Sequence, residues 1–408
     1  MKILHLNCVY KYGSTGKIVD CIALDLRSNG HYSIVCYGNG NEYYDDYSKK
    51  ICTNVEHLLN AFRHRIDGLP LGGYYFSNKR VERVITEFSP DVVHVHCING
   101  SILNVYSLLK YLAYNNLKTV ATLHAEFMFT GGCAHAFDCE KWKTHCRDCS
   151  RYKREVSTLF FDRSYDAWQK MYDAFRLFKS ENIIITAVSP WLADRAKMSP
   201  MFAGFKVESV LNGLNEKIFY RRLSEAIIDR EHYDRVALFV TPSFDLDANN
   251  IKGGYFLPCI ADRLTNTKFI VVCSGVIPDN LSLPSNIQIW GKARSQDELA
   301  QLYSEADYTL LLSRKETFSM VTAESLCCGT PVVGFKSGGP ESIALPHYST
   351  FVEYANVDAL LSAVDIMLNN SYNRDRISKE AIAHYSSNVM TTAYCSIYSN
   401  FLNEEIGI

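Results

Sequence analysis

The sequence lacks any hydrophobic run long enough to cross a membrane as a helix. Its longest apolar runs, such as residues 183–188 and 269–273, have the length of strands, whereas a spanning helix needs about 20 apolar residues. The first ten residues contain one lysine, and His5 and Asn7 interrupt their apolar stretch, which predicts a buried strand and not a secretion signal. We therefore expect a cytoplasmic protein.

The chain also has little net charge, no low-complexity tract and no internal repeat. Its 42 lysines and arginines nearly balance 44 aspartates and glutamates, which leaves a formal charge of −2. Because there is no global basic field, nucleic acid is excluded as the main partner. A length of 408 residues with 47% hydrophobic content instead predicts two domains of ordinary size.

A P-loop is missing as well. The run GSTGK at residues 13–17 is followed by Ile18 where a P-loop needs Ser or Thr, and its glycine spacing is wrong, so an ATPase of that type is excluded. Gly13 and Gly16 leave two interpretations open. They either form a tight turn between the first strand and helix, or let the backbone approach a ligand.

Strand-like and helix-like stretches alternate along the chain, which predicts an α/β fold with a doubly wound parallel sheet in each half. The expected strands of the first half are residues 3–8, 33–37, 92–96, 119–124 and 183–189. Those of the second half are residues 236–241, 269–274, 287–290, 308–312 and 332–335. Asn212 and Gly213 form a turn signal, and we place the hinge between the halves there.

The most informative pattern spans residues 313–342. A short apolar strand leads into a loop with Glu316 and then into a helix, residues 319–328, that carries Glu324. Such a loop lies at the carboxyl edge of a parallel sheet, and the N–H groups at the helix start suit a diphosphate. Carboxylates hold vicinal hydroxyls well, so the two glutamates are candidates for a sugar and a ribose. By spacing alone, two solvated surface glutamates are the simpler interpretation.

This segment resembles the signature of the retaining glycosyltransferases of family 4, which have the GT-B fold. The matching positions are Glu316, Phe318, Ser319, Glu324, residues 329–333 and residues 338–341. Residues 187–219 resemble the family's domain junction. Residues 90–100 and 122–133 resemble the acceptor-side loops of a bacterial surface-polysaccharide subgroup similar to colanic acid glycosyltransferases, so the resemblance covers most of the chain.

The resemblance implies two Rossmann-like domains that face each other across a cleft. Residues 1–212 would bind the acceptor, residues 213–385 would bind the donor, and a helix within residues 386–408 would cross back onto the first domain. The implied activity is transfer of a hexose from a nucleoside diphosphate sugar to a growing, lipid-linked surface glycan such as O-antigen, capsule or exopolysaccharide. Transfer would retain the anomeric configuration and would require no cofactor or metal, since fixed cations and backbone dipoles stabilise the diphosphate.

The same resemblance gives roles to individual residues. The implied catalytic groups are Glu316 and His124 at the sugar and Lys252 at the departing diphosphate. The implied donor-binding positions are Gly13, Gly16, Lys252, Gly253, Gly291, Arg294, Glu316, Phe318, Ser319, Met320, Val321 and Glu324. The implied acceptor-binding positions are His96, Asn99 and Glu126.

One departure from the family keeps other functions open. Family members pair an arginine with the Lys-Gly of the donor loop, whereas residues 243–254 supply Lys252 and Gly253 but no arginine. Asp245 and Asp247 in this loop weaken the binding of an anion unless they point away or hold a cation. The missing arginine therefore keeps a non-catalytic nucleotide-sugar-binding subunit as an alternative. A nucleotide-sugar epimerase of GT-B-like fold stays as another, because such enzymes use related folds on nucleotide sugars without an acceptor.

Three histidines are candidates for the first half of the site. Since His94 and His96 alternate along one expected strand, we expect their side chains to point to opposite faces, with His94 structural and His96 toward a ligand. His124 ends the next expected strand.

Most of the fourteen cysteines occur singly in apolar runs, as reduced core residues do. Four fall in the polar loop 131–151, namely Cys133, Cys139, Cys146 and Cys149. The last two have a spacing common in structural zinc sites, and we favour zinc slightly over reduced or occasionally paired thiols. Residues 141–154, with Trp142, Tyr152 and several basic groups, are a candidate contact with the inner face of the cytoplasmic membrane.

Overall fold

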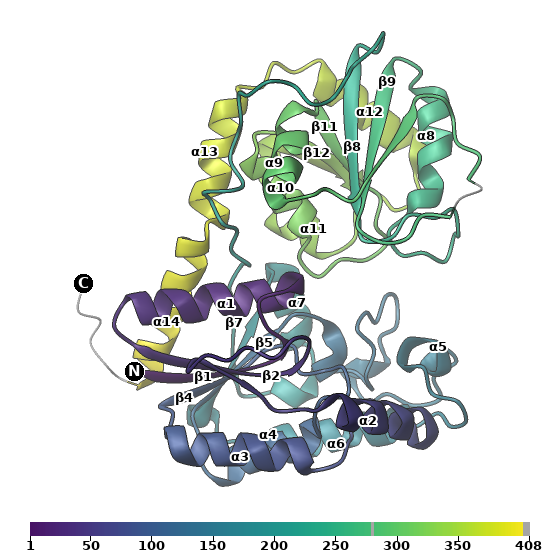
Figure 1. Ribbon diagram of the computed structural model, residues 1–408. Coiled ribbons are helices and arrows are strands. Elements are labelled where there is room, and N and C mark those ends of the chain that lie inside the picture. The colour runs from purple at the N-terminus through teal and green to yellow at the C-terminus, as the bar shows by residue number, and fades with distance from the viewer. Residues whose placement is uncertain (279–280, 403–408) are drawn as a thin grey trace. The chain divides into compact units, whose positions relative to one another are not determined.

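The computed structural model describes residues 1–278 and 281–402. By contacts, the chain divides into two compact units, one comprising Met1–Leu211 and the chain from Met390 onward, the other Asn212–Val389. Each unit is built on one parallel sheet with helices on its faces (Figure 1). The predicted pair of doubly wound α/β sheets is therefore confirmed.

The first unit contains a seven-stranded sheet in the order β3-β2-β1-β4-β5-β6-β7, and all of its neighbouring strands are parallel. The strands are β1 (Lys2–Val9), β2 (Tyr32–Asn39), β3 (Ser48–Lys50), β4 (Val92–Val95), β5 (Thr119–Leu123), β6 (Ile183–Ala187) and β7 (Lys206–Ser209). The order reverses between β1 and β4. In open sheets of this kind, ligands bind beyond the carboxyl ends of the strands at such a point.

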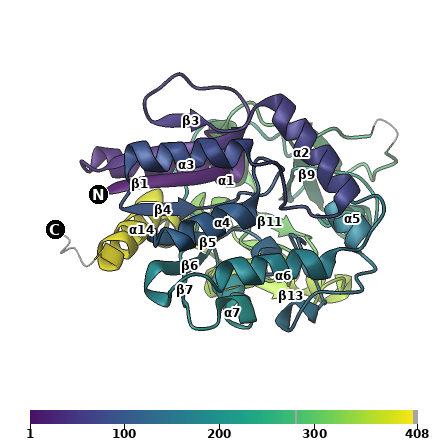
Figure 2. The ribbon, with the colours of Figure 1, turned by 90° about the horizontal axis from the view of Figure 1, so that it is seen from below.

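Helices cover both faces of this sheet. They are α1 (Gly13–Ser28), α2 (Asn54–Asp67), α3 (Phe76–Phe88), α4 (Val105–Tyr114), α5 (Tyr152–Val156), α6 (Ser164–Phe175), α7 (Pro190–Lys197) and α14 (Ser387–Leu402). Figures 1 and 2 show α3, α4 and α6 on one face, and α1 and α14 on the other. Ile22 of α1 and Tyr398 of α14 belong to one apolar cluster with Ile3 and Val92 of the strands.

The second unit contains a six-stranded parallel sheet in the order β10-β9-β8-β11-β12-β13. The strands are β8 (Arg235–Thr241), β9 (Thr267–Cys273), β10 (Ile287–Gly291), β11 (Tyr308–Leu311), β12 (Val332–Phe335) and β13 (Ser349–Val352). The helices are α8 (Leu257–Arg263), α9 (Gln296–Glu305), α10 (Met320–Cys327), α11 (Gly339–Ile343), α12 (Val357–Leu368) and α13 (Arg374–Tyr385). Here the order reverses between β8 and β11, and the loops after these two strands carry the donor motifs.

Three strands, β3, β7 and β13, were not predicted from the sequence, and all three lie at edges of the sheets. An edge strand is covered on fewer sides, so it needs fewer apolar residues to be stable. β7 reads KVES, with no fully buried residue, and β3 reads SKK. Neither segment has the apolar run by which the central strands were recognised.

The terminal helix is anchored in the first unit by a buried polar contact. A hydrogen bond of 2.6 Å joins the Tyr398 hydroxyl of α14 to His94 Nδ1 of β4, and both residues are fully buried. We predict that Tyr398→Phe lowers the free energy of unfolding by about 1–3 kcal/mol, because a buried ring nitrogen loses its partner. Denaturant unfolding measures this. Tyr114→Phe, at a 69% exposed tyrosine, is the control, and equal stability of both variants would contradict the anchor.

Candidate functional site

The loop that carries Glu316 joins β11 to α10 and is held by a second loop. The Glu316 N–H donates to the Ser337 carbonyl at 3.0 Å, and the Gly339 N–H donates to the Glu316 carbonyl at 2.8 Å. A Cβ at Gly339 would lie 2.4 Å from the Thr317 carbonyl. The glycines at 338–339 therefore allow the two loops to approach, which fixes the backbone of Glu316.

Lys252 and Glu316 form an ion pair. Lys252 Nζ donates to Glu316 Oε1 at 2.6 Å, and the two side chains are 23% and 18% exposed. Gly253 makes this possible, since its φ is +72° and a Cβ there would lie 2.1 Å from the Leu312 carbonyl oxygen. The structure thus brings together two predicted catalytic residues from the ends of neighbouring strands, β8 and β11.

The start of α10 lies directly after this loop. Ser319 caps the helix with a φ of +81°, and its hydroxyl accepts from the Thr322 N–H at 3.2 Å. The first N–H groups of a helix have no partner within the helix, so those of Met320 and Val321 are suited to an anion. Phe318 is 3% exposed, so only its backbone is placed to contact a ligand.

Glu324 lies one turn inside α10 and has a partner that we did not predict. The Tyr303 hydroxyl of α9 donates to Glu324 Oε2 at 3.0 Å. Burial, followed by the nearby Glu324 charge, raises the pKa of Tyr303 well above its ordinary value. Tyr303 therefore stays protonated and orients the carboxylate. No pattern in the sequence singles this tyrosine out.

Three further donor-side predictions have different outcomes. Gly291 ends β10 with a φ of +80°, while Arg294 is exposed and pairs with Glu298 at 3.3 Å. Gly13 already begins α1 and Gly16 lies in its first turn. With a φ of +65°, Gly13 has the left-handed backbone of a glycine turn at the junction of strand and helix, and the approach of a ligand to it stays a prediction.

The two aspartates of the donor loop are used within the loop. Asp245 accepts from the Asn250 amide at 2.8 Å and from the Asp247 N–H at 3.0 Å. Asp247 accepts from the Asn249 N–H at 2.9 Å. Such contacts are typical of short turns that carboxylates stabilise, so these side chains shape the approach to Lys252.

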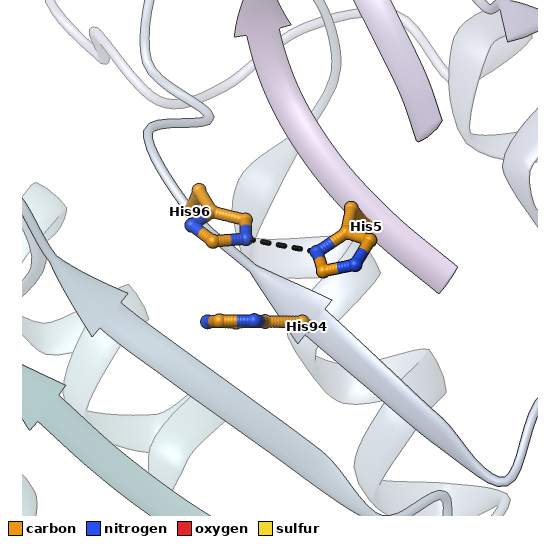
Figure 3. A group of neighbouring side chains, drawn as sticks. All are labelled: His5, His94 and His96. Carbon is orange, nitrogen blue, oxygen red and sulfur yellow. Dashed lines mark hydrogen bonds between the residues drawn. The ribbon is translucent and has the colours of Figure 1, made fainter. Parts of the chain in front are cut away.

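In the first unit, buried histidines lie near the point between β1 and β4 where the strand order reverses. His5, His94 and His96 are each 0% exposed, and the rings of His94 and His96 lie 3.7 Å apart (Figure 3). The predicted opposite orientation is wrong, because residues two apart in a strand share a face. His96 is fully buried, and its contact with an acceptor stays a prediction.

His5 and His96 form a hydrogen-bonded chain of histidines that ends at His124. His5 Nδ1 lies 3.1 Å from His96 Nε2, and His96 Nδ1 lies 3.4 Å from His124 Nε2. Burial lowers the pKa of His124 to about 4, and burial together with nearby Arg27 lowers the pKa of His5 to about 3. For His96 burial is again the main cause of a pKa well below the ordinary value. The imidazole rings of these hydrogen-bonded histidines are therefore uncharged at physiological pH.

The ligand atoms of His5, His94 and His96 lie within 4.8 Å of one another, the spacing of a metal site. His94, however, is already bound through both nitrogens, at 2.6 Å to the Tyr398 hydroxyl and at 2.6 Å to Thr122 Oγ1. Its ring lies beneath that of His96, with 34° between the two ring planes (Figure 3), and both of its nitrogens are occupied by these hydrogen bonds. This cluster is a packed polar core.

Two residues predicted to contact an acceptor make contacts within the first unit. Glu126 is 0% exposed, pairs with Arg195 and accepts from the Ala136 N–H at 2.6 Å. Through these contacts Glu126 ties the following loop to α7, and its contact with an acceptor stays a prediction. Asn99 accepts a hydrogen bond from the Cys97 thiol at 2.9 Å and is only partly buried.

The predicted membrane contact within residues 141–154 needs a correction. Trp142 and Tyr152 are both 0% exposed. The Trp142 ring N–H donates to the Cys139 carbonyl at 2.8 Å, and the Tyr152 hydroxyl donates to the Gly68 carbonyl at 2.6 Å. These aromatic rings hold the loop and are not available to a bilayer.

Comparison with known proteins agrees with this geometry. Residues 279–384 match the family of glycosyl transferases group 1. The chain is 20% identical over 437 residues to the colanic acid biosynthesis glycosyl transferase WcaC of Escherichia coli (strain K12). This alignment covers 98% of this chain and 100% of that protein. The likeness to the glycosyl transferases group 1 family thus lies in the second unit, while the likeness to that protein extends over 98% of this chain.

Two further relatives define the limits of the likeness. N-acetyl-alpha-D-glucosaminyl L-malate synthase of Bacillus anthracis is 28% identical over 131 residues, 31% of this chain and 34% of that protein. This chain therefore matches about a third of the synthase. Anabaena Alr3699/HepE in complex with UDP and glucose superposes with a TM-score of 0.64 at 14% identity, over 98% of this chain and 100% of that one. The fold is GT-B.

Within residues 1–278 and 281–402, no helix is long and apolar enough to cross a membrane.

The buried histidines predict how stability depends on pH. In the unfolded chain they bind protons near pH 6.5, whereas the folded state keeps them neutral to lower pH. The free energy of unfolding should therefore fall between about pH 6.5 and pH 4, by up to about 1.4 kcal/mol per pH unit for each histidine.

Urea unfolding at a series of pH values measures this dependence. His5→Asn should lower the slope by the share of one histidine, while the control His232→Asn, at an exposed position, should not. A free energy of unfolding that stays flat from pH 7 to pH 5 would contradict neutral burial.

Proposed function

We propose that this protein is a retaining glycosyltransferase that transfers a hexose from a nucleoside diphosphate sugar to a growing, lipid-linked surface glycan. The single observation that carries the proposal is the Lys252–Glu316 ion pair beside the start of α10. A diphosphate needs a cation and N–H donors, and a hexose needs a carboxylate. The loops after β8 and β11 offer all three together. The likeness to HepE, which binds UDP and glucose, makes UDP-sugars the first donors to test.

The ion pair prepares both residues for the donor. Without ligand, Lys252 and Glu316 neutralise each other, so neither is a partly buried unpaired charge. When a donor binds, Lys252 exchanges Glu316 for a phosphate oxygen, and Glu316 accepts hydrogen bonds from sugar hydroxyls. Glu324, oriented by Tyr303, holds the ribose hydroxyls at the other end of the donor.

The chemistry follows from where charge develops. The bond between the anomeric carbon and the phosphate oxygen breaks, and the negative charge grows on the departing diphosphate. Lys252 and the N–H groups of Met320 and Val321 stabilise this charge without a divalent ion. The acceptor hydroxyl attacks from the side of the departing diphosphate, whose oxygen takes its proton, so the anomeric configuration is retained. The His124 ring is hydrogen-bonded to His96 and lies at the end of the hydrogen-bonded histidines in the first unit.

We predict that Glu316→Gln lowers the transfer rate by roughly 10- to 100-fold, since a charge-assisted hydrogen bond contributes about 1.5–3 kcal/mol. Affinity for free nucleoside diphosphate should not fall, because Lys252 loses a competing partner. Lys252→Met should lower both the transfer rate and the affinity for free nucleoside diphosphate. The assay combines calorimetric titration with UDP and product analysis by NMR, without added divalent ions.

Glu353→Gln is the matched control, because Glu353 forms an exposed ion pair with Lys336 in the same unit. Wild-type transfer by Glu316→Gln would contradict the donor site. An epimerised nucleotide sugar as the product would identify an epimerase, and nucleotide binding without any product would identify a binding subunit.

The lipid-linked acceptor implies contact with a membrane, and α2 offers the surface for it. Apolar side chains of α2 that stand 40% or more exposed are Val55, Leu58, Leu59, Phe62 and Ile66. Leu159, Phe160 and Phe161 are also more than 50% exposed. The Leu159 N–H donates to the Arg65 carbonyl of α2 at 2.8 Å, so the two groups form one apolar surface. An apolar helix face of this kind inserts at the interface of a bilayer.

We predict that the double variant Leu58→Glu and Phe62→Glu loses most binding to vesicles of anionic phospholipid, measured by co-sedimentation. Transfer to a water-soluble acceptor should be unchanged, since the donor residues lie in the other unit. Ile366→Glu, at a 66% exposed position of the second unit, is the control. Equal sedimentation of both variants with the vesicles would contradict this surface.

A further inference from the structure

Four thiols enclose a small cavity in the loop that follows β5. The residues that line it include Cys133, Cys139, Cys146 and Cys149, and all four are free of disulfides. The cavity has a volume of about 20 Å³, which is room for one particle the size of a water molecule. An organic ligand does not fit, whereas a single metal ion does.

Cations surround the same cavity. Lys141, Arg147 and Arg151 belong to its lining. Lys141 is held in place by the Arg147 and Asp148 carbonyls, and Arg151 by the Ala136 carbonyl. A divalent ion with four thiolates carries a net charge of −2, and these side chains offset it.

The loop has little else to hold it. Between Phe129 and Arg151, its regular structure is the single turn Lys141–Lys143. Long segments without secondary structure are uncommon in compact domains, and small structures with little core rely on disulfides or metals.

We propose that Cys133, Cys139, Cys146 and Cys149 bind one structural Zn²⁺ ion. Thiolates are soft ligands that suit zinc, and four of them complete its tetrahedral shell, which leaves no position for substrate. The ion fixes the loop that Glu126 ties to α7. This inference is independent of the proposed transfer reaction.

Binding requires the four sulfurs to contract. At a zinc–sulfur distance of about 2.3 Å, tetrahedral ligands lie about 3.8 Å apart. Among the residues that the structure describes, the buried histidines and not these thiols have three ligand atoms within 4.8 Å of one another. The cysteines must therefore move together by about 1 Å or more.

The test begins with the full chain purified without chelator or added metal. Elemental analysis should find one zinc per chain, and X-ray absorption should find four sulfur neighbours at about 2.3 Å. Cys146→Ser and Cys149→Ser should each lower the zinc content at least fivefold. Cys259→Ser, at the exposed cysteine of α8, should keep the full content.

A second measurement covers the case in which the serine variants fail to fold. Wild-type protein stripped with a strong chelator is titrated with Co²⁺, and one equivalent should produce the absorption of tetrahedral cobalt thiolate. UDP binding by the second unit should persist, which separates loss of the metal from failure of the donor site. Metal-free protein with four titratable thiols and no response to Zn²⁺ or Co²⁺ would overturn the proposal. A Cys133–Cys149 disulfide in protein purified without reductant would overturn it too.

Discussion

The ion pair between Lys252 and Glu316 is the constraint on which the second unit's site depends. The two residues are 64 positions apart in the sequence and meet at 2.6 Å because β8 and β11 are neighbours in the sheet. Two partly buried charges are tolerated there only as partners of each other or of a ligand. The close approach of Gly253 to the Leu312 carbonyl and the contact of Gly339 with Thr317 both serve to hold this pair at the start of α10.

The first unit uses polar residues differently, because it buries them. His5, His94 and His96 lie inside the sheet. His5 is hydrogen-bonded to His96, and His94 to Thr122 and to Tyr398 of the last helix, while His5 Nε2 has no hydrogen-bond partner among the described residues. A neutral imidazole both donates and accepts, so a row of them can transmit an orientation through the core. His124 is the member of this chain nearest the carboxyl edge, and its ring position follows from the buried members behind it.

Sequence patterns identified the central strands and the donor loop, since these depend on local apolar runs and on a strand, loop and helix in fixed order. Contacts between segments distant in the sequence could not be predicted from it. The residues around Glu126 do not indicate that it pairs with Arg195, 69 positions later. Those around Glu324 do not indicate its hydrogen bond with Tyr303. The edge strands β3, β7 and β13 were missed because exposure removes the apolar signal. His94 and His96 differ from the expected opposite orientation because residues two apart along a strand share a face.

A crystal structure of the full chain with a bound UDP-sugar tests the central claim most directly. The account predicts diphosphate oxygens within hydrogen-bond distance of the Met320 and Val321 N–H groups and of Lys252 Nζ, with Glu316 turned to the hexose and Glu324 to the ribose. A donor bound elsewhere, or a Lys252–Glu316 pair left intact beside the bound donor, would contradict it.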